Sequence, residues 1–174
     1  MGFVCGLFGK KRGSLAAAIG VSALIKSSSV SLHDDVRKAM SVLDDADLVR
    51  CDQELEKSVD EALDRILATG ESGFDLLFQR LCQGLSVKGT DLCVSFDGGS
   101  EWNEWLKKKS VVNALGRSGA EFAVPRLGSI LMVRSTVGQF VDILQPALIQ
   151  AIVDIGGNTA VNELQKALAS SNLL

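Results

Sequence analysis

Hydrophobic residues recur along much of the chain at intervals of three and four, the spacing that places side chains on one face of an α-helix. Two early stripes follow this rule: Leu32, Val36, Met40 and Leu43, and then Leu48, Leu55, Val59, Leu63 and Ile66. We expect Ser31 to begin the first helix and the stretch "DDAD" (44–47) to form the corner before the second, because carboxylates stabilise a helix N-terminus. Gly70 is expected to end the second helix.

The middle of the chain contains one break in the helical pattern. A third apolar helix is predicted from Phe74 to about Leu85. Residues 89–100 then alternate between apolar and polar positions and end in Asp97-Gly98-Gly99, which predicts an extended loop or one strand of a pair, followed by a turn. After a cap at Ser100, residues 101–115 predict a helix with Trp102, Trp105 and Leu106 on one face.

The final third is the most hydrophobic part of the sequence. Its periodic apolar positions are Val137, Phe140, Val141, Leu144, Leu148, Ile152 and Val153. This surface predicts the buried centre of a bundle or an oligomer interface, and we expect another copy or another molecule to cover it. Pro125 and Pro146 should kink or restart helices, Gly156-Gly157 should end this run, and Thr159 should cap a last helix through Leu168.

These elements predict an all-α, single-domain bundle of about six to eight helices around a central hydrophobic helix. A chain of 174 residues, 47% hydrophobic and with two prolines, can bury such a core. We place a basic N-terminal arm with a short helix (Ser14–Lys26) at residues 1–30 and the helical bundle at residues 31–174.

Residues with catalytic or metal-binding chemistry are sparse. Cys5, Cys51, Cys82 and Cys93 are widely spaced and lack a CxxC pair, so we interpret them as free thiols in a reducing compartment. His33 is the one histidine, and its place in the first turn of a helix favours a structural role. The acidic pairs do not fit a calcium loop, and "GLFGKKRGS" does not fit a phosphate-binding loop. The sequence therefore predicts a non-enzymatic protein with no catalytic residue, cofactor, metal or small-molecule substrate.

No apolar run reaches the roughly 18 residues that a membrane-spanning helix needs. The run "SLAAAIGVSALI" has the length of a signal-peptide core, but Lys26 and a serine run follow where a cleavage site would lie. We expect a cytoplasmic or otherwise intracellular protein, with a membrane-peripheral location or a viral particle as alternatives.

Charge is distributed unevenly, although the net charge is −3. The first 30 residues contain Lys10, Lys11, Arg12 and Lys26 but no acidic residue, whereas residues 31–75 carry a net charge of −8. Three interpretations fit this arm: lipidation at Gly2 or Cys5 beside the basic residues, neutralisation of nucleic acid within a shell, or docking of "FVCGLF" on a neighbouring groove. The third requires no ligand, and we favour it.

Three short motifs resemble the B-cell-lymphoma family of apoptosis regulators. "VDEALDRILATGESGFDLLFQRL" resembles the family's death-promoting helix, with Ile66 four residues before Gly70-Glu71. "NALGRSG" (113–119) resembles its asparagine–aromatic–glycine–arginine signature, and "IGGNTAVNEL" (155–164) its later double-glycine motif. The signature tryptophans are absent. The resemblance implies a helical bundle that holds a partner helix in a groove.

We predict a structural or interaction protein that self-assembles into an oligomer or a coat-like shell through helical faces and the arm. The arm residues expected to make contacts are Phe3, Val4, Leu7, Phe8, Lys10, Lys11 and Arg12. Trp102 and Trp105 are either interface anchors or ordinary core residues. The predicted partners are further copies of the chain, with non-specific nucleic acid or an anionic membrane as further contacts of the arm. The alternatives are a regulator that binds a partner helix in a groove and a membrane-peripheral adaptor.

Overall fold

The computed structural model describes residues 34–88, 91–94, 101–133, 135 and 137–170. Within these ranges the chain forms seven α-helices, three short helical segments and one β-hairpin. In chain order they are α2 (Asp34–Asp45), η1 (Leu48–Arg50), α3 (Gln53–Leu67), α4 (Glu71–Cys82), β1 (Leu85–Lys88), β2 (Asp91–Val94), α5 (Glu101–Arg117), η2 (Glu121–Ala123), α6 (Val124–Leu131), η3 (Phe140–Leu144), α7 (Gln145–Ile155) and α8 (Gly157–Ala169). The predicted all-α bundle is confirmed. The arm, the helix at 14–26 and His33 lie outside the described residues.

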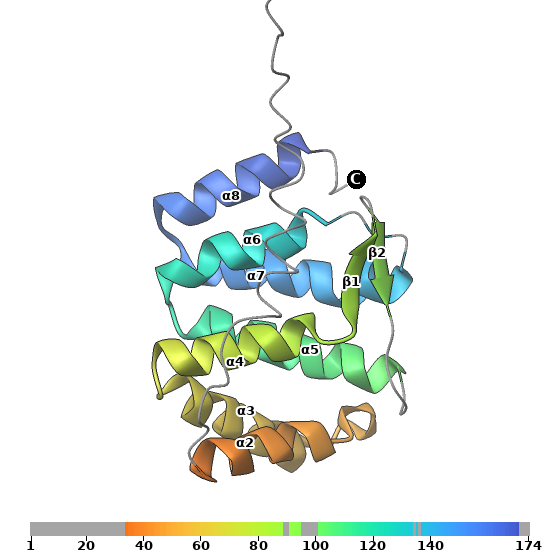
Figure 1. Ribbon diagram of the computed structural model, residues 1–174, viewed down its shortest axis with the longest axis vertical. Helices are drawn as coiled ribbons and strands as arrows, with labels where there is room; N and C mark the ends of the chain where they lie inside the picture. The colour runs from red at the N-terminus through yellow and green to blue at the C-terminus, as the bar shows by residue number, and fades with distance from the viewer. Residues whose placement is uncertain (1–33, 89–90, 95–100, 134, 136, 171–174) are drawn as a thin grey trace, which may run out of the picture.

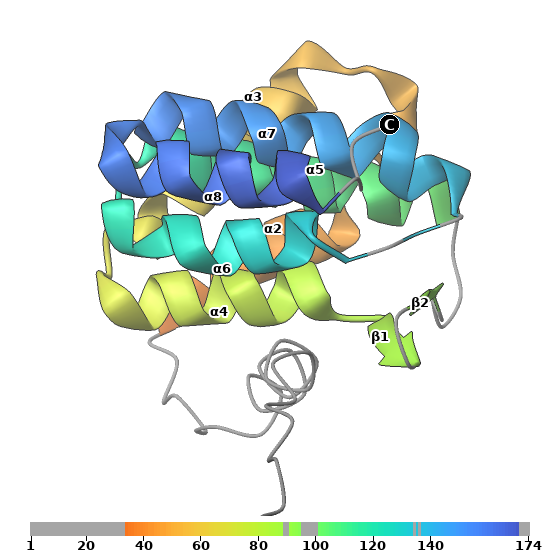
Figure 2. The same cartoon turned by 90° about the horizontal axis from the view of Figure 1, so that it is seen from above.

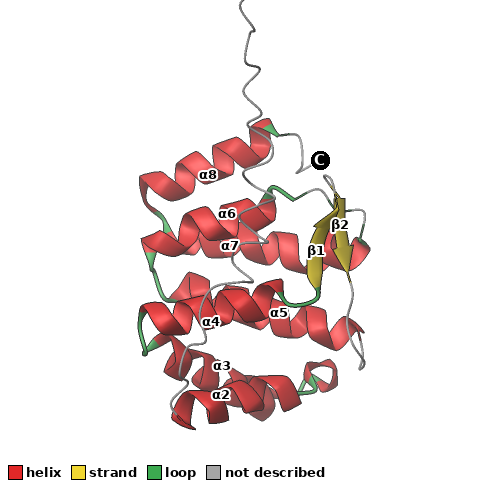
Figure 3. Ribbon diagram, in the orientation of Figure 1, coloured by secondary structure: helices red, strands yellow, loops and turns green. Residues whose placement is uncertain are grey.

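The helices stack along one direction. Figure 1 shows α8 at one end, then α6 and α7, then α4 and α5, with α2 and α3 at the other end. Figure 2, turned by 90°, shows that α4 and α6 lie on one side of α5 and α7. Helix α7 packs against α5, α6 and α8, so it is the central hydrophobic helix that the sequence predicts. The hairpin lies beside the helical stack, beyond the end of α4 (Figure 3).

The core is built from aliphatic side chains that every described α-helix contributes, and Trp105, Phe78 and Phe140 are its largest fully buried apolar members. In the final third, Phe140, Leu144, Leu148 and Ile152 are buried within this single chain. The expectation that another molecule must cover this stretch is therefore wrong for those positions. Val141 and Val153 remain exposed, because they lie on the outer sides of η3 and α7.

A close approach of two backbones joins the C-terminal end of α5 to the middle of α7. A Cβ atom placed on Gly116 would lie 2.8 Å from the Cα atom of Ala151. Real carbon atoms do not approach so closely without a shift of the backbone. Glycine at position 116 thus sets the separation of the two most extensively packed helices.

Both prolines occupy the first turn of a helix, as predicted. Pro125 opens α6, where its missing N–H group breaks no hydrogen bond of that helix, and Pro146 is the second residue of α7. The five residues before α7, Phe140–Leu144, form a π-helical segment. The chain therefore enters α7 without a gap, and Gly156, at φ 70°, ends it.

Three boundaries differ from the sequence-based expectation. Leu48 lies in η1 and not in the following helix, because Asp52 caps α3 by accepting hydrogen bonds from the N–H groups of Glu54 and Leu55. Leu85 is not helical: it opens β1, which pairs antiparallel with β2. Thr159 lies within α8 instead of capping it, and its hydroxyl donates to Glu121.

Candidate binding groove and the buried cations beside it

A largely apolar groove of about 440 Å³ opens between α2, α4 and the start of β1. Its lining residues are Met40, Leu76, Phe78, Gln79, Arg80, Cys82, Gln83, Gly84 and Leu85. A second cavity of about 190 Å³ lies between α3 and α5 and is mainly polar. The first groove is the better candidate for binding, because ligand sites are concave, mostly apolar and edged by a few polar groups.

The wall formed by α4 is held from behind by α6. The guanidinium carbon of Arg126 lies 4.2 Å from the centre of the Phe78 ring, and one of its nitrogens donates to Asp75 at 2.6 Å. Phe78 is thereby fixed on the core side of α4, while Leu76 is half-buried and Gln79 is exposed. Helix α4, which forms this wall of the groove, is therefore held in place by its contacts with α6.

One end of the groove is formed by Arg80, whose side chain is 9% exposed. Its Nε atom donates to Asp44 of α2 and a terminal nitrogen donates to Glu104 of α5, both at 2.9 Å. Burial alone would raise the pKa of Glu104, but Arg80 and then Lys107 outweigh it and hold this pKa below its usual value. Asp44 and Glu104 therefore neutralise the cation that lines the groove.

Lys108 is a buried cation that closes the C-terminal end of α4. Its residue is 1% exposed, and its Nζ atom lies 2.8 Å from the carbonyl oxygen of Leu81, 2.6 Å from that of Gln83 and 3.4 Å from that of Arg80. The last carbonyl groups of an α-helix have no partner within the helix, so an ammonium group there stabilises them. Burial, followed by the charge of Arg80, lowers the pKa of Lys108 to about 7.

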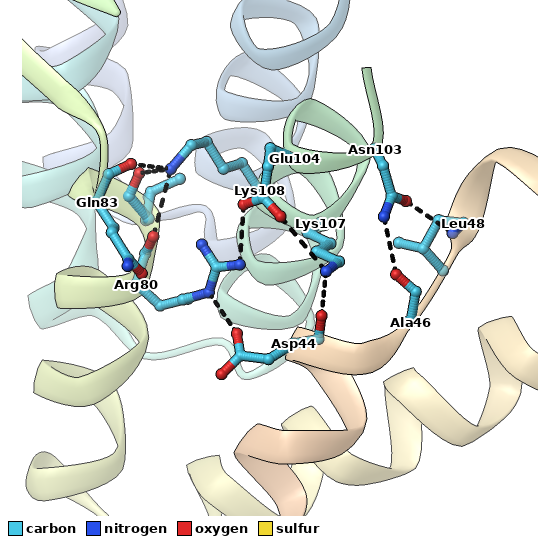
Figure 4. Close-up of polar contacts among 10 residues, drawn as sticks. Asp44, Ala46, Leu48, Arg80, Gln83, Asn103, Glu104, Lys107 and Lys108 are labelled. Carbon is cyan, nitrogen blue, oxygen red and sulfur yellow. Dashed lines mark hydrogen bonds and ion pairs between the residues drawn. The ribbon is translucent and has the colours of Figure 1, made fainter. Parts of the chain in front are cut away.

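The first turns of α5 also hold the corner between α2 and η1. Asn103 donates to the carbonyl oxygen of Ala46 at 2.9 Å and accepts from the N–H of Leu48 at 2.8 Å. Lys107 donates to the carbonyl oxygen of Asp44 and lies 3.4 Å from Glu104. Figure 4 shows Asn103 and Lys107 directed toward the corner between α2 and η1. It shows Glu104 and Lys108, on the same helix, directed toward the end of α4. Helix α5 therefore fixes the spacing of the two helices that flank the groove.

The geometry of this cluster favours a structural role over catalysis. Lys108 directs its ammonium group at backbone carbonyl oxygens, not at the solvent. Burial raises the pKa of Cys82, although Lys108 and Arg126 oppose that effect, so its thiol is a poor nucleophile. In the described part of the chain no group of three His, Cys, Asp or Glu side chains is placed to hold a metal ion.

The two tryptophans that the sequence singled out lie in different environments. Trp105 is fully buried and packs edge-to-face against Phe140, with ring centres 6.3 Å apart, so it belongs to the core. Trp102 is 48% exposed and is the one that a partner could reach. The seven arm residues, from Phe3 to Arg12, lie outside the described residues. Cys51, Cys82 and Cys93 are free thiols.

The burial of Lys107 and Lys108 was not predicted from the sequence. A signal was present: Trp105, Lys108, Val112 and Leu115 follow one another at spacings of three and four residues. Lys108 thus interrupts the buried stripe of α5, and such an interruption indicates a buried polar group with partners.

None of the helices in the described residues has the length and apolar character needed to cross a membrane. Comparison with protein-family models, curated proteins and solved structures gives no match. The resemblance to apoptosis regulators therefore rests on its three short motifs. These motifs fall on α3 and α4, on the end of α5, and on the junction of α7 and α8.

Proposed function

We propose that the protein is a non-enzymatic binding protein that receives an apolar segment of a partner protein in the groove between α2, α4 and β1. The observation that carries this proposal is the groove itself, with Met40, Leu76 and Leu85 available to an apolar side chain. A peptide that places apolar side chains from successive turns in such a groove gains affinity, because the apolar surfaces of the peptide and of the groove are both removed from water.

Selection from a random peptide library tests this proposal. The full chain is used, alongside a variant with Phe3, Leu7 and Phe8 changed to glutamate so that an apolar arm cannot compete. We expect enriched peptides to be rich in large apolar residues. Their affinity should fall at least about tenfold with Leu76→Glu, because a carboxylate in the apolar lining costs more than the ~1.4 kcal/mol that corresponds to a factor of ten.

Two further variants sharpen the result. Gln79→Trp fills the groove from an exposed position and should also weaken binding, without disturbing the core. Leu168→Glu on α8 adds the same charge as Leu76→Glu at an exposed position in another part of the molecule and should leave binding unchanged. The proposal would be contradicted if the selected peptides bound the Leu76→Glu and Gln79→Trp variants as tightly as they bind the unchanged groove. It would also be contradicted if neither the full chain nor the arm variant enriched any peptide.

Self-assembly is a second candidate function, favoured by one feature of α8. Val161, Leu164 and Leu168 follow one another at spacings of three and four, and Leu168 is 69% exposed. This helix lies at the end of the stack (Figure 1), so two copies could pack these stripes against each other about a two-fold axis. Sedimentation velocity at several concentrations tests this: Leu168→Glu should abolish any oligomer and Gln165→Glu should retain it. A monomer at all concentrations contradicts it.

A further inference from the structure

The size and lining of the groove define the side chains that it suits. A cavity of about 150 Å³ lined by aliphatic residues binds one benzene ring. The groove holds about 440 Å³, so it has room for two or three side chains of the size of phenylalanine or leucine. Its occupant should therefore present several large apolar residues close together.

The charged side chains around the groove indicate which charge the occupant should carry next to its apolar residues. Arg80 is already bound to Asp44 and Glu104 and does not attract an anion. Helix α2, which contributes Met40 to the lining, carries four aspartates (Asp34, Asp35, Asp44 and Asp45) against Arg37 and Lys38, a net charge of −2. Asp34 pairs with Arg37 and Asp44 with Arg80, so Asp35 and Asp45 supply the remaining negative charge. An apolar segment followed by cations would thus meet complementary charge along α2.

The N-terminal arm has this composition. Residues 3–8 read "FVCGLF", with four large apolar side chains in six residues, and Lys10, Lys11 and Arg12 follow directly. No acidic residue interrupts the first 33 residues. The same chain therefore carries both an apolar anchor and a basic extension that match the groove and its acidic flank.

The arm is long enough to reach the groove of its own chain. Residues 13–33 connect Arg12 to the start of α2; with the predicted helix at Ser14–Lys26 and the other residues extended, this segment can span up to about 45 Å. Met40 lies six residues into the same helix, about 9 Å along its axis from Asp34. A tether of this length holds the arm at an effective concentration on the order of 1 mM, well above that of a second copy in dilute solution.

We infer that residues 3–12 of the same chain occupy the groove between α2, α4 and β1, with Phe3, Leu7 and Phe8 in the cavity and Lys10, Lys11 and Arg12 along α2. This inference rests on the proposed function, and it adds regulation to it. A partner must displace the arm, so its apparent affinity is reduced by the fraction of chains whose groove is free. Release or modification of the arm would activate binding.

The methionines provide a direct test in the full chain, because Met40 lines the groove while Met132 lies at the end of α6. The methyl resonances of a 13C-methionine-labelled sample are compared between the wild type and a variant with Phe3→Glu and Phe8→Glu. The Met40 resonance should move and the Met132 resonance should stay. A control with Ser27→Glu and Ser29→Glu adds the same charge to the connecting segment and should move neither. An unchanged Met40 resonance in the arm variant would overturn the inference.

Two measurements separate this inference from related outcomes. The Met40 resonance should be independent of protein concentration below the effective concentration of the arm, on the order of 1 mM. A concentration-dependent resonance would instead assign the arm to a second copy and overturn the inference. A peptide selected for the groove should bind the arm variant about tenfold more tightly than the wild type. Equal affinities would overturn the inference and leave the proposed function standing, whereas the proposed function fails if no groove-dependent peptide exists.

Discussion

The Nζ atom of Lys108 on α5 lies 2.6 Å from the carbonyl oxygen of Gln83, the C-cap residue of α4. Gln83, Gly84 and Leu85 turn the chain from α4 into β1 and also line the groove. One buried amine thus binds the carbonyl groups at which α4 stops and the lining of the groove continues into β1. The groove is thus connected to α5 through this contact.

Changing Lys108 to methionine should destabilise the fold. The replacement preserves most of the side-chain volume but leaves the carbonyl groups of Leu81 and Gln83 without their donor. We expect the free energy of unfolding at pH 7 to fall by about 2 kcal/mol, the usual cost of buried polar groups that lose their partners. Urea denaturation measures this change. Lys109→Met, at the exposed neighbouring position, should change it by less than about 0.5 kcal/mol, and equal effects of the two changes would refute the assignment.

Stability should depend on pH through the same lysine. Its pKa is about 7 in the folded chain and 10.5 in the absence of burial, so between these values the unfolded state binds one more proton. The free energy of unfolding of the wild type relative to Lys108→Met should therefore rise from pH 7 to pH 10, by at most about 1.4 kcal/mol per pH unit, and level off below pH 7. Denaturation of both proteins at each pH tests this, and a difference that stays constant or falls would contradict it.

Asn103→Ala should loosen the corner between α2 and η1. The change removes the acceptor of the Leu48 N–H and the donor to the Ala46 carbonyl group. We expect the free energy of unfolding to fall by about 1–3 kcal/mol, and amide exchange at Leu48 to become faster. Asn158→Ala, at an exposed position on α8, is the matched control and should have little effect. Unchanged exchange at Leu48 would show that the hydrogen bond does not hold this corner.

Gly116→Ala should separate α5 from α7. The added methyl group would lie 2.8 Å from the Cα atom of Ala151, so one helix must shift, at an expected cost of about 1–3 kcal/mol in the free energy of unfolding. Gly138→Ala is the control, because the nearest atom to its added methyl group is 3.9 Å away. Thermal denaturation compares the two. A Gly116→Ala protein as stable as the wild type would contradict the close packing of these helices.

The features that sequence analysis placed correctly depend on local physics. The positions of Pro125 and Pro146 at helix starts follow from the geometry of proline itself. The stripe from Val59 to Ile66 is buried because a regular helix places those residues on one face. Neither conclusion requires knowledge of distant parts of the chain.

The hairpin shows where local reasoning fails. Leu85 continues the apolar spacing of α4, so the sequence favours a longer helix. The chain instead turns at Gly84, at φ 73°, and Leu85 pairs with Val94. A helix end that Lys108 holds from 25 residues away, and a strand that needs a partner, cannot be inferred from the periodicity of either segment.

The candidate site was predictable only in part. The composition of the arm predicts that it binds an apolar surface beside acidic residues. The contacts of the arm residues remain predictions. The groove depends on the separation between α2 and α4, which Asn103, Glu104 and Lys107 set from a third helix. No pattern in α2 or α4 alone reports that separation.

The most direct test of the account is a titration of a groove-selected peptide into the 13C-methionine-labelled protein that carries Phe3→Glu and Phe8→Glu. We predict that the Met40 methyl resonance shifts saturably with the affinity of the peptide, that the Met132 resonance stays in place, and that Leu76→Glu weakens both binding and shift by at least about tenfold. A peptide that binds while the Met40 resonance remains unchanged would show that the groove between α2, α4 and β1 is not the binding site.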